Sequence, residues 1–407
     1  MNTICLNMIV KNESHIIEKT LENLCQYIDF SYWVISDTGS TDNTVEIIEN
    51  FFDQKKISGE IVYDDWKNFA HNRNRALESC TNKADYVFFF DADDSIHGNF
   101  MLPETLDKDA YYLQMKNEWS DTLYQRFLLV KNDGNFYWRG ALHEFLEHRT
   151  PIVTDIIDGD YYVISGRLGS RNTNPQQKYL HDAHVLEQAI ISNEDPDLMA
   201  RYMFYLGNSY RDAENYEKAV EWYTLRIAMG GWIEEVTCAY ENKGIALEAL
   251  GRKEEALNTW LMGYDYNPKR AECLYNAVRL LRMDEKYRIA YQLGMIAKSI
   301  PFPKNDILFV KSSVYSYWIY YELSISAYYV KEFRFAYQCC ETVLLKDPNN
   351  DVVVRTTINN LQFYKEEAIH FEENLPKVIS IIEDYLERFP SDQSKFSDTL
   401  MYLQQLL

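Results

Sequence analysis

The sequence predicts two regions of different fold class, a mostly parallel α/β domain at the N-terminal end and an all-helical region after it. In the first part of the 407-residue chain, short apolar runs alternate with longer segments of helical spacing, which is the pattern of a parallel sheet with connecting helices. After about Asp195 the apolar runs disappear and helical spacing continues towards the C-terminal end. The length fits two or three domains.

Four short apolar runs are the expected strands of the parallel part of the sheet. Beyond them, from about Ala110 to about Ile164, aromatic and β-branched residues are separated by turn signals such as Asn132-Asp133-Gly134, which predicts an antiparallel extension of the sheet. The four parallel strands are expected at residues 3–10, 32–37, 61–63 and 86–91.

Three helices are expected between these strands. Asn12 is the predicted N-cap of the first, whose apolar positions recur at the 3.6-residue period. The segment Asn43-Thr44-Val45-Glu46 resembles a capping box at the start of the second helix. The third is expected from Asn68 to Cys80.

The helical region contains an internal repeat. Ala219, Ala256, Ala290 and Ala336 are spaced by 37, 34 and 46 residues, close to the 34-residue tetratricopeptide period, with one insertion around Pro301-Phe302-Pro303. Small residues at such points let paired helices approach closely. A helical bundle without repeats is the alternative.

The repeat gives the expected division of the chain. A final helical segment from Val378 is expected to close the array. We therefore expect an α/β domain, a linker helix, the repeats and the capping helices at residues 1–175, 176–195, 196–365 and 366–407.

Charge, cysteine content and hydropathy limit the classes of partner and the compartment to be expected for this protein. With 62 acidic against 41 basic residues the net charge is −21, which repels phosphate backbones unless the protein holds a cation, so nucleic acid is not an expected partner. The seven cysteines form no metal-type or disulfide-type pattern, which favours a reducing compartment. No basic leader or run of about 18 apolar residues is present, so we expect a cytoplasmic protein without an integral membrane segment.

Acidic residues at the ends of two predicted strands are the first candidates for a site. Asp37 closes YWVISD, and Asp91-Ala92-Asp93-Asp94 follows YVFFF. Ligands of open parallel sheets bind beyond the carboxyl ends of the strands. An Asp-x-Asp in this place can direct two carboxylates at a divalent cation that bridges nucleotide phosphates, whereas a solvated turn is the alternative.

Four motifs follow one another along the first half of the chain: Met8-Ile9-Val10-Lys11-Asn12-Glu13, Asp37-Thr38-Gly39-Ser40-Thr41-Asp42, Trp66-x-x-Phe69-Ala70-x-x-Arg73-Asn74-x-Ala76-Leu77 and Asp91-Ala92-Asp93-Asp94. In this order they resemble the motifs of family 2 glycosyltransferases with a GT-A fold. Trp138-x-Gly140-x-x-His143-Glu144, followed by helical repeats, resembles the subgroup that joins such a domain to tetratricopeptide repeats.

The resemblance implies a GT-A nucleotide-sugar-binding domain that transfers a sugar from a nucleotide diphosphate donor, with a UDP sugar favoured, and with inversion at the anomeric carbon. It also implies Mn²⁺ or Mg²⁺, which would absorb charge on the leaving phosphate. The motif residues carried over are Val10, Asn12, Glu13 and Asp37 for the base and ribose, and Asp91, Ala92 and Asp93 for the metal and diphosphate.

The pair His143-Glu144 is open to two interpretations. In one, His143 completes the metal shell and Glu144 is the base that takes the acceptor proton. In the other, His143 is a buried structural imidazole and Glu144 pairs with Arg139. Because successive strand residues point to opposite faces, both side chains can serve one site only from a loop. Asp94 and Asp121 are rival bases.

Three arginines are candidates for contact with the donor. Arg73 lies in the helix expected beside the crevice, where it could pair a phosphate or hold Asp91, a surface salt bridge being the alternative. Arg167 and Arg171 lie in a Gly-rich loop of an acidic protein, and this loop could close over the diphosphate. No metal role is expected for the loop.

The sequence therefore predicts metal-dependent sugar transfer to an acceptor, a peptide, protein or glycan, that the helical repeats present or recruit. The repeats are also compatible with oligomerisation. A catalytically inactive, nucleotide-sugar-binding scaffold that uses its repeats for protein–protein interaction is the alternative. A nucleotidyltransferase is disfavoured, because Lys11-Asn12-Glu13 stands where its Gly-rich, Arg-containing loop would follow the first strand.

Overall fold

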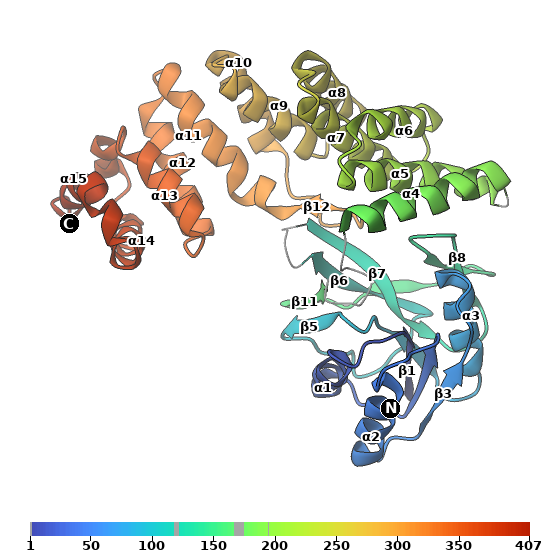
Figure 1. The fold of residues 1–407 in the computed structure, drawn as a ribbon. Helices are drawn as coiled ribbons and strands as arrows, with labels where there is room; N and C mark the ends of the chain where they lie inside the picture. The colour runs from blue at the N-terminus through green and yellow to red at the C-terminus, as the bar shows by residue number, and fades with distance from the viewer. Residues whose placement is uncertain (1, 118–121, 167–174, 194) are drawn as a thin grey trace. The chain divides into compact units, whose positions relative to one another are not determined.

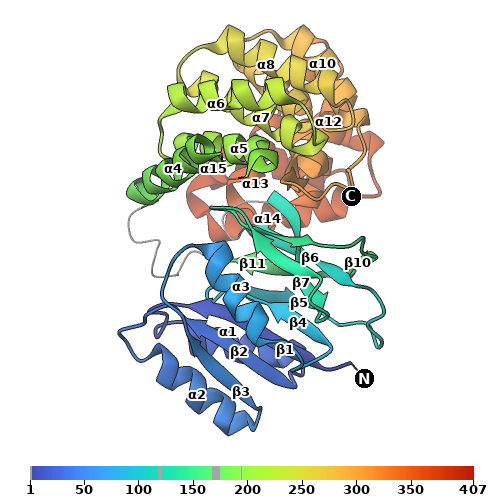
Figure 2. The same ribbon diagram turned by 90° about the vertical axis from the view of Figure 1, so that its right-hand side faces the viewer.

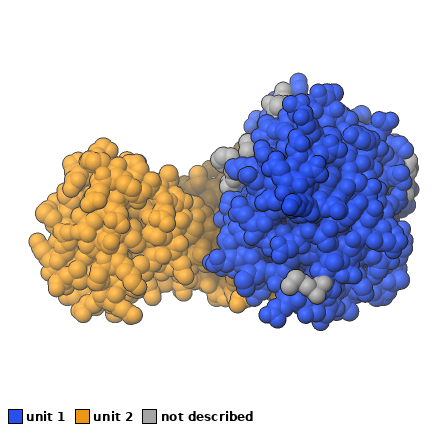
Figure 3. Space-filling view, turned by 90° about the horizontal axis from the view of Figure 1, so that it is seen from below, with its two compact units in different colours: residues 1–230, 306–310 blue, residues 231–305, 311–407 orange. Residues whose placement is uncertain are grey.

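The computed structural model describes residues 2–117, 122–166, 175–193 and 195–407. The chain divides into two compact units, coloured separately in Figure 3: residues 1–230 with 306–310, and residues 231–305 with 311–407. The first unit therefore contains the sheet together with the first helices that follow it.

The first unit is built on a ten-stranded mixed sheet. Its strands are β1 (Ile4–Val10), β2 (Tyr32–Asp37), β3 (Gly59–Tyr63), β4 (Tyr86–Phe89), β5 (Ser95–Gly98), β6 (Ala110–Asn117), β7 (Thr122–Lys131), β10 (Thr154–Ile156), β11 (Tyr161–Ser165) and β12 (Val310–Lys311). The order is β3-β2-β1-β4-β7-β6-β11-β5 (Figure 2). Outside this order, β10 pairs with β6 and β12 pairs with β7. A separate hairpin is formed by β8 (Phe136–Arg139) and β9 (Phe145–His148).

The pairing confirms the predicted fold class, a mixed and mostly parallel α/β sheet followed by helices. Strands β1 to β4 are parallel neighbours. The antiparallel extension is confirmed for β7, which runs antiparallel to both β4 and β6. It is wrong for the pairing of β10 and β11 with β6, which is parallel, because long connections return the chain to the same end of the sheet. On its other side, β11 runs antiparallel to β5.

Three helices connect the parallel strands: α1 (Ile17–Tyr27), α2 (Thr44–Lys55) and α3 (Phe69–Ser79). In this strand order, the connections from β1 to β2 and from β2 to β3 run in one direction across the sheet, and the connection from β3 to β4 runs in the other. With the usual right-handed crossover, α1 and α2 lie on one face of the sheet and α3 on the opposite face (Figure 1). Helix α3 thereby reaches the β8–β9 hairpin.

Neither of the two predicted caps makes a capping bond, whereas the predicted start of the third helix at Asn68 is confirmed and is capped. The Asn68 side chain accepts a hydrogen bond from the His71 amide at 2.8 Å and caps α3. Asn43 precedes α2 as expected, but its side chain makes no capping bond. The prediction for Asn12 is wrong: it has a φ of +57°, and α1 begins only at Ile17.

Helices occupy the rest of the chain. They are α4 (Pro175–Ser192), η2 (Pro196–Leu198), α5 (Met199–Asp212), α6 (Tyr216–Met229), α7 (Ile233–Ala249), α8 (Lys253–Tyr266), α9 (Glu272–Met283), α10 (Tyr287–Ser299), η3 (Val314–Trp318), α11 (Ile319–Tyr329), α12 (Phe333–Lys346), α13 (Asp351–Leu361), η4 (Lys365–His370), α14 (Leu375–Arg388), η5 (Pro390–Asp392) and α15 (Gln393–Gln404). Helices α5 to α12 pack in consecutive pairs.

The alanines of the predicted repeat occupy equivalent positions in these pairs. Ala219, Ala256, Ala290 and Ala336 are each the fourth residue of the second helix of a pair, and all four are fully buried. The predicted insertion lies between α10 and α11. Assignment of the pairs to the tetratricopeptide family stays a prediction.

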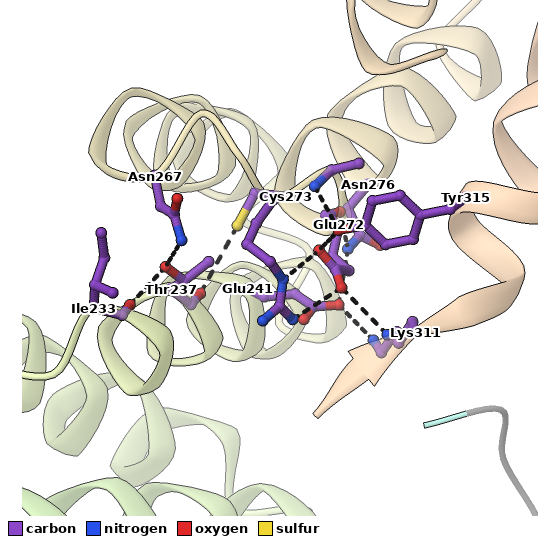
Figure 4. Close-up of polar contacts among 11 residues, drawn as sticks. Ile233, Thr237, Glu241, Asn267, Glu272, Cys273, Asn276, Lys311 and Tyr315 are labelled. Carbon is purple, nitrogen blue, oxygen red and sulfur yellow. Dashed lines mark hydrogen bonds and ion pairs between the residues drawn. The ribbon is translucent and has the colours of Figure 1, made fainter. Parts of the chain in front are cut away.

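In the second unit, a buried ionic network fastens the segment after the insertion to α7 and α9 (Figure 4). Arg270 and Glu272 are both almost fully buried and share two hydrogen bonds of 3.0 and 2.9 Å. The Tyr315 hydroxyl donates to Glu272 at 2.7 Å, and Lys311 Nζ lies 2.5 Å from Glu241. Through these paired charges, Lys311 and Tyr315 of the segment contact Glu241 of α7 and Glu272 of α9.

Candidate active site

The loops after β1 and β2 hold each other at the carboxyl edge of the sheet. The Val10 carbonyl accepts hydrogen bonds from both the amide and the hydroxyl of Thr38, each at 3.0 Å. The Asn12 amide donates to Ser40 Oγ at 2.9 Å, and Asn12 Oδ1 accepts from the Thr41 amide at 2.7 Å. This use of its side chain explains why Asn12 does not cap α1.

The same edge carries the other two residues predicted for the base and ribose. The Glu13 amide donates to Thr44 Oγ1 at 2.8 Å, at the start of α2. The Asp37 carboxylate is buried and accepts the amides of Gly39 and Ser40, the shortest of these bonds being 3.1 Å. The two loops therefore form one hydrogen-bonded rim above β1 and β2.

The acidic loop after β4 is stabilised by arginines. Arg73 Nη2 donates to Asp91 Oδ1 at 2.5 Å, and Arg126 Nη1 lies 3.4 Å from Asp91 Oδ2. Burial raises the pKa of Asp91, but the positive charges of Arg73 and Arg126 outweigh it and hold that pKa below its usual range. Asp91 is therefore ionised and remains partly exposed, at 29% of its side chain.

Asp94 has the opposite electrostatic environment. It is 3% exposed, and its Oδ1 accepts the Gly166 amide at 3.2 Å. Burial, together with the nearby charge of Asp91, raises the pKa of Asp94 well above its usual range. The loop therefore combines two carboxylates whose pKa values are shifted in opposite directions, Asp91 downwards and Asp94 upwards.

Arg73 joins this loop to Glu144. Its Nε donates to Glu144 Oε1 at 2.7 Å, and its guanidinium lies over the Trp138 ring at 4.9 Å from the centroid. The Asn74 side chain, next along α3, bonds both the amide and the carbonyl of Trp138, at 2.7 and 2.8 Å. Helix α3 thus fixes the β8–β9 hairpin, whose loop carries Glu144.

His143 and Glu144 lie in the loop between β8 and β9, and their side chains have different partners. The His143 ring stacks on Tyr205 of α5, with centroids 4.0 Å apart and planes 14° apart. Among the residues that the structure describes, no three or more His, Cys, Asp or Glu side chains are arranged to hold a metal ion. The ligand set Asp91, Asp93 and His143 stays a prediction.

The structure thus brings Arg73, Asp91 and Glu144 into one ionic network. This agrees with the prediction that Arg73 holds Asp91. It does not pair Glu144 with Arg139, because Arg139 binds Asp195 and Asp197 of the next segment. That alternative is wrong. Arg167, Arg171 and Asp121 lie outside the described residues.

Two residues of the site were not anticipated. Arg126 lies on β7. In the sequence it is noticeable only as a charged residue within a largely apolar strand, which does not indicate a role in the site. Gly166 follows β11, and a Cβ built on it would lie 1.8 Å from the Asp93 carbonyl oxygen. The close approach of two backbones makes glycine necessary there, but in the sequence it is one glycine of a Gly-rich loop.

Comparison with known proteins assigns a class to this part of the chain. Residues 5–110 match the model of Glycosyl transferase family 2. The chain is 39% identical over 92 residues to the glycosyltransferase SunS of Bacillus subtilis (strain 168) and to SunS of Bacillus phage SPbeta. Each match covers 22% of this chain and 20% of the relative, so the chain matches about one fifth of the length of these relatives. The N-terminal region therefore contains a family 2 glycosyl transferase domain.

Solved structures resemble larger parts of the chain at low identity. S. aureus TarS 1-349 in complex with UDP-GlcNAc is 14% identical, with a TM-score of 0.33, and covers 62% of this chain and 89% of its own. The mannosyltransferase PcManGT from Pyrobaculum calidifontis, in complex with GDP-Man and Mn²⁺, is 14% identical with a TM-score of 0.34, and covers 63% and 85%. In the described ranges, no helix is long and apolar enough to cross a membrane.

Proposed function

We propose that the protein is a glycosyltransferase that transfers a sugar from a nucleotide diphosphate donor to an acceptor. The observation that carries the proposal is the acidic loop Asp91–Asp94, which follows a buried strand at the carboxyl edge of a family 2 domain and is joined to Glu144 through Arg73. The relatives that match this domain are themselves named glycosyltransferases.

The donor would lie across the three loops at this edge. Val10, Asn12, Glu13 and Asp37 would bind the nucleoside, a uridine in the favoured case. Asp91, Ala92 and Asp93 would bind the diphosphate and its cation. Carboxylate oxygens are the ligands that Mn²⁺ and Mg²⁺ prefer, and the partly exposed Asp91 fits that role. A bound cation would absorb the charge that develops on the leaving diphosphate.

The arginines complete the electrostatics. The contact of Arg126 with Asp91 is long, at 3.4 Å, and its side chain is 28% exposed, so it can turn towards a phosphate when the donor binds. Arg73 is buried between two carboxylates and instead keeps Asp91 and Glu144 in position. Arg167 and Arg171 would close over the diphosphate.

Two carboxylates are proposed for the proton transfer. Glu144 would take the acceptor proton from the position in which Arg73 holds it, with inversion at the anomeric carbon. Asp94 is the second candidate, because burial and the charge of Asp91 raise the pKa of its carboxylate and so increase its affinity for a proton. His143 would complete the metal shell, which requires its ring to leave Tyr205. The helical region would recruit the acceptor, a peptide, protein or glycan, because stacked helix pairs form extended binding surfaces.

The experiment is a thermal-shift and calorimetric titration of UDP, GDP and their sugars, with and without Mn²⁺, on the wild-type chain, Asp93→Asn and the control Asp53→Asn. Asp53 is an exposed carboxylate of α2, remote in sequence from the loop. A true donor at a hundredfold excess over Kd stabilises the native state by about 2.7 kcal/mol. This gain should need Mn²⁺ and should vanish only in Asp93→Asn.

Release of the nucleoside diphosphate from the bound donor then separates an enzyme from a scaffold. Metal-dependent turnover supports the transferase, and its comparison in Glu144→Gln and Asp94→Asn assigns the base, whose loss should cost about 10²–10⁴-fold. Binding without turnover supports the inactive scaffold. Undiminished Mn²⁺-dependent turnover in Asp93→Asn would contradict the metal assignment.

A further inference from the structure

The loop between β8 and β9, residues 140–144, has two sides. Glu144 points to one side, where it meets Arg73 of α3. Residues at alternate positions, Arg139, Ala141, His143 and Phe145, all contact the segment formed by η2 and α5. Ala141 is held through its backbone amide and His143 through its backbone carbonyl. These contacts therefore fix the backbone from which the Glu144 side chain projects.

The first half of the loop is bound through side chains of α5 and of the residues just before it. The Arg139 guanidinium contacts the carboxylates of Asp195 and Asp197 at 3.1 and 2.5 Å. The Tyr202 hydroxyl accepts the Ala141 amide at 3.1 Å and donates to Asp195 at 3.0 Å. These residues form a continuous hydrogen-bonded connection from the loop to α5.

The second half of the loop is bound at a strained residue. His143 has a φ of +53°, a left-handed conformation that is unfavourable for a residue with a Cβ and persists where the surroundings impose it. Tyr205 stacks on its ring. Arg201 donates to its carbonyl at 2.8 Å and lies over the Phe145 ring at 4.7 Å from the centroid.

We propose that α5 positions the Glu144 loop, with Tyr205 and Arg201 as positioning residues. Helix α5 is then part of the catalytic unit, and the later helices are left to recruit the acceptor. The inference rests on the proposed function for its effect on turnover, but the support of the loop by α5 can be measured without any donor. A boundary placed at residue 195 would separate Glu144 from the side chains that hold its loop.

The experiment compares three variants of the full-length chain: Tyr205→Ala, Tyr205→Phe and the control Tyr337→Ala. Tyr337 is also a buried tyrosine that stacks on an aromatic ring, with its centroid 5.1 Å from that of Phe371, but it lies on α12 in the second unit. Peptide-level amide hydrogen exchange over residues 139–147 reports the loop. UDP release from UDP-sugars with Mn²⁺ reports kcat and the donor KM.

Tyr205→Ala should speed exchange in the loop and lower kcat by about 10–100-fold, because displacement of a reacting group by about 1 Å costs up to 10²-fold. The donor KM should stay within about threefold, since the loops after β1 and β2 are untouched. Tyr205→Phe keeps the stacked ring and should restore both readouts. Tyr337→Ala should change neither.

Unchanged exchange in Tyr205→Ala would overturn the inference, as would equal acceleration in Tyr337→Ala, which would reveal general unfolding. Faster exchange with wild-type kcat would show that Tyr205 supports the loop without positioning the chemistry, and would also overturn it. The wild-type chain could also fail to bind or turn over any donor, which would refute the proposed function. Faster exchange in Tyr205→Ala would in that case still establish that α5 supports the loop.

Discussion

Substitution of Gly166 by alanine tests the arrangement of the acidic loop most directly. Gly166 follows β11, and its amide donates to Asp94 Oδ1 at 3.2 Å. A Cβ at this position would lie 1.8 Å from the Asp93 carbonyl oxygen and 2.8 Å from the Asp93 carbonyl carbon. The obstacle is backbone, so no side chain can turn away to relieve it.

The displacement can be estimated from this distance. Ordinary contact of a Cβ begins at 3.4 Å, so the two backbones must separate by about 1.6 Å along the line that joins the atoms. Since displacement of catalytic groups by about 1 Å costs up to 10²-fold, we expect Mn²⁺-dependent nucleotide affinity or turnover to fall by about 10²-fold. The accompanying loss of stability should be about 1–3 kcal/mol, as for other overpacked sites.

Isothermal titration of UDP in the presence of Mn²⁺, with urea unfolding of the same samples, measures both quantities. Gly59→Ala is the matched control, because its Cβ would lie 2.2 Å from the Trp33 ring at the first residue of β3, at the opposite end of the sheet. The control should lose stability and keep its nucleotide affinity. If Gly166→Ala bound the nucleotide and released product as the wild type does, the reasoning would be refuted.

Two further predictions concern stability. Asn74→Ala leaves the amide and carbonyl of Trp138 without the side-chain bonds of 2.7 and 2.8 Å, so the free energy of unfolding in urea should fall by about 2 kcal/mol. Asn74→Asp, which keeps an acceptor for the amide, should lose less, and equal losses would contradict the account. Gly244→Ala places a Cβ 2.2 Å from Trp260 Nε1 between α7 and α8 and should cost about 1–3 kcal/mol. A smaller side chain in Gly244→Ala/Trp260→Phe should recover part of this loss, and strictly additive losses would argue against the collision.

Features that depend on neighbours in the chain could be predicted from the sequence. The apolar run before Asp91 predicts a buried strand followed by an acidic loop, and β4 has that structure. The spacing of small residues predicts the helix pairs, because each alanine marks the same point of a second helix. Such patterns are local, since strand and helix periods are set by backbone geometry alone.

The failures concern local patterns that a distant segment overrides. Asn12 has the composition and position of a helix cap, but its side chain instead binds Thr41, which is 29 residues away. The alternative partner of Glu144, Arg139, is near in sequence, yet Asp195 and Asp197 of a later segment take its guanidinium. Competition of this kind depends on which loops meet at the edge of the sheet.

The sequence by itself determined the four parallel strands, the helix pairs and the acidic residues at the carboxyl ends of two of those strands. Only the tertiary structure decided which groups face those residues: Arg126 through the pairing of β7 with β4, and Gly166 through the return of β11. Tyr205 likewise reaches the Glu144 loop from a helix 62 residues further along the chain. Strand register and helix packing bring these groups together, because burial of the shared apolar core selects one arrangement of the segments. The local sequence of a segment does not show which distant segment it will contact.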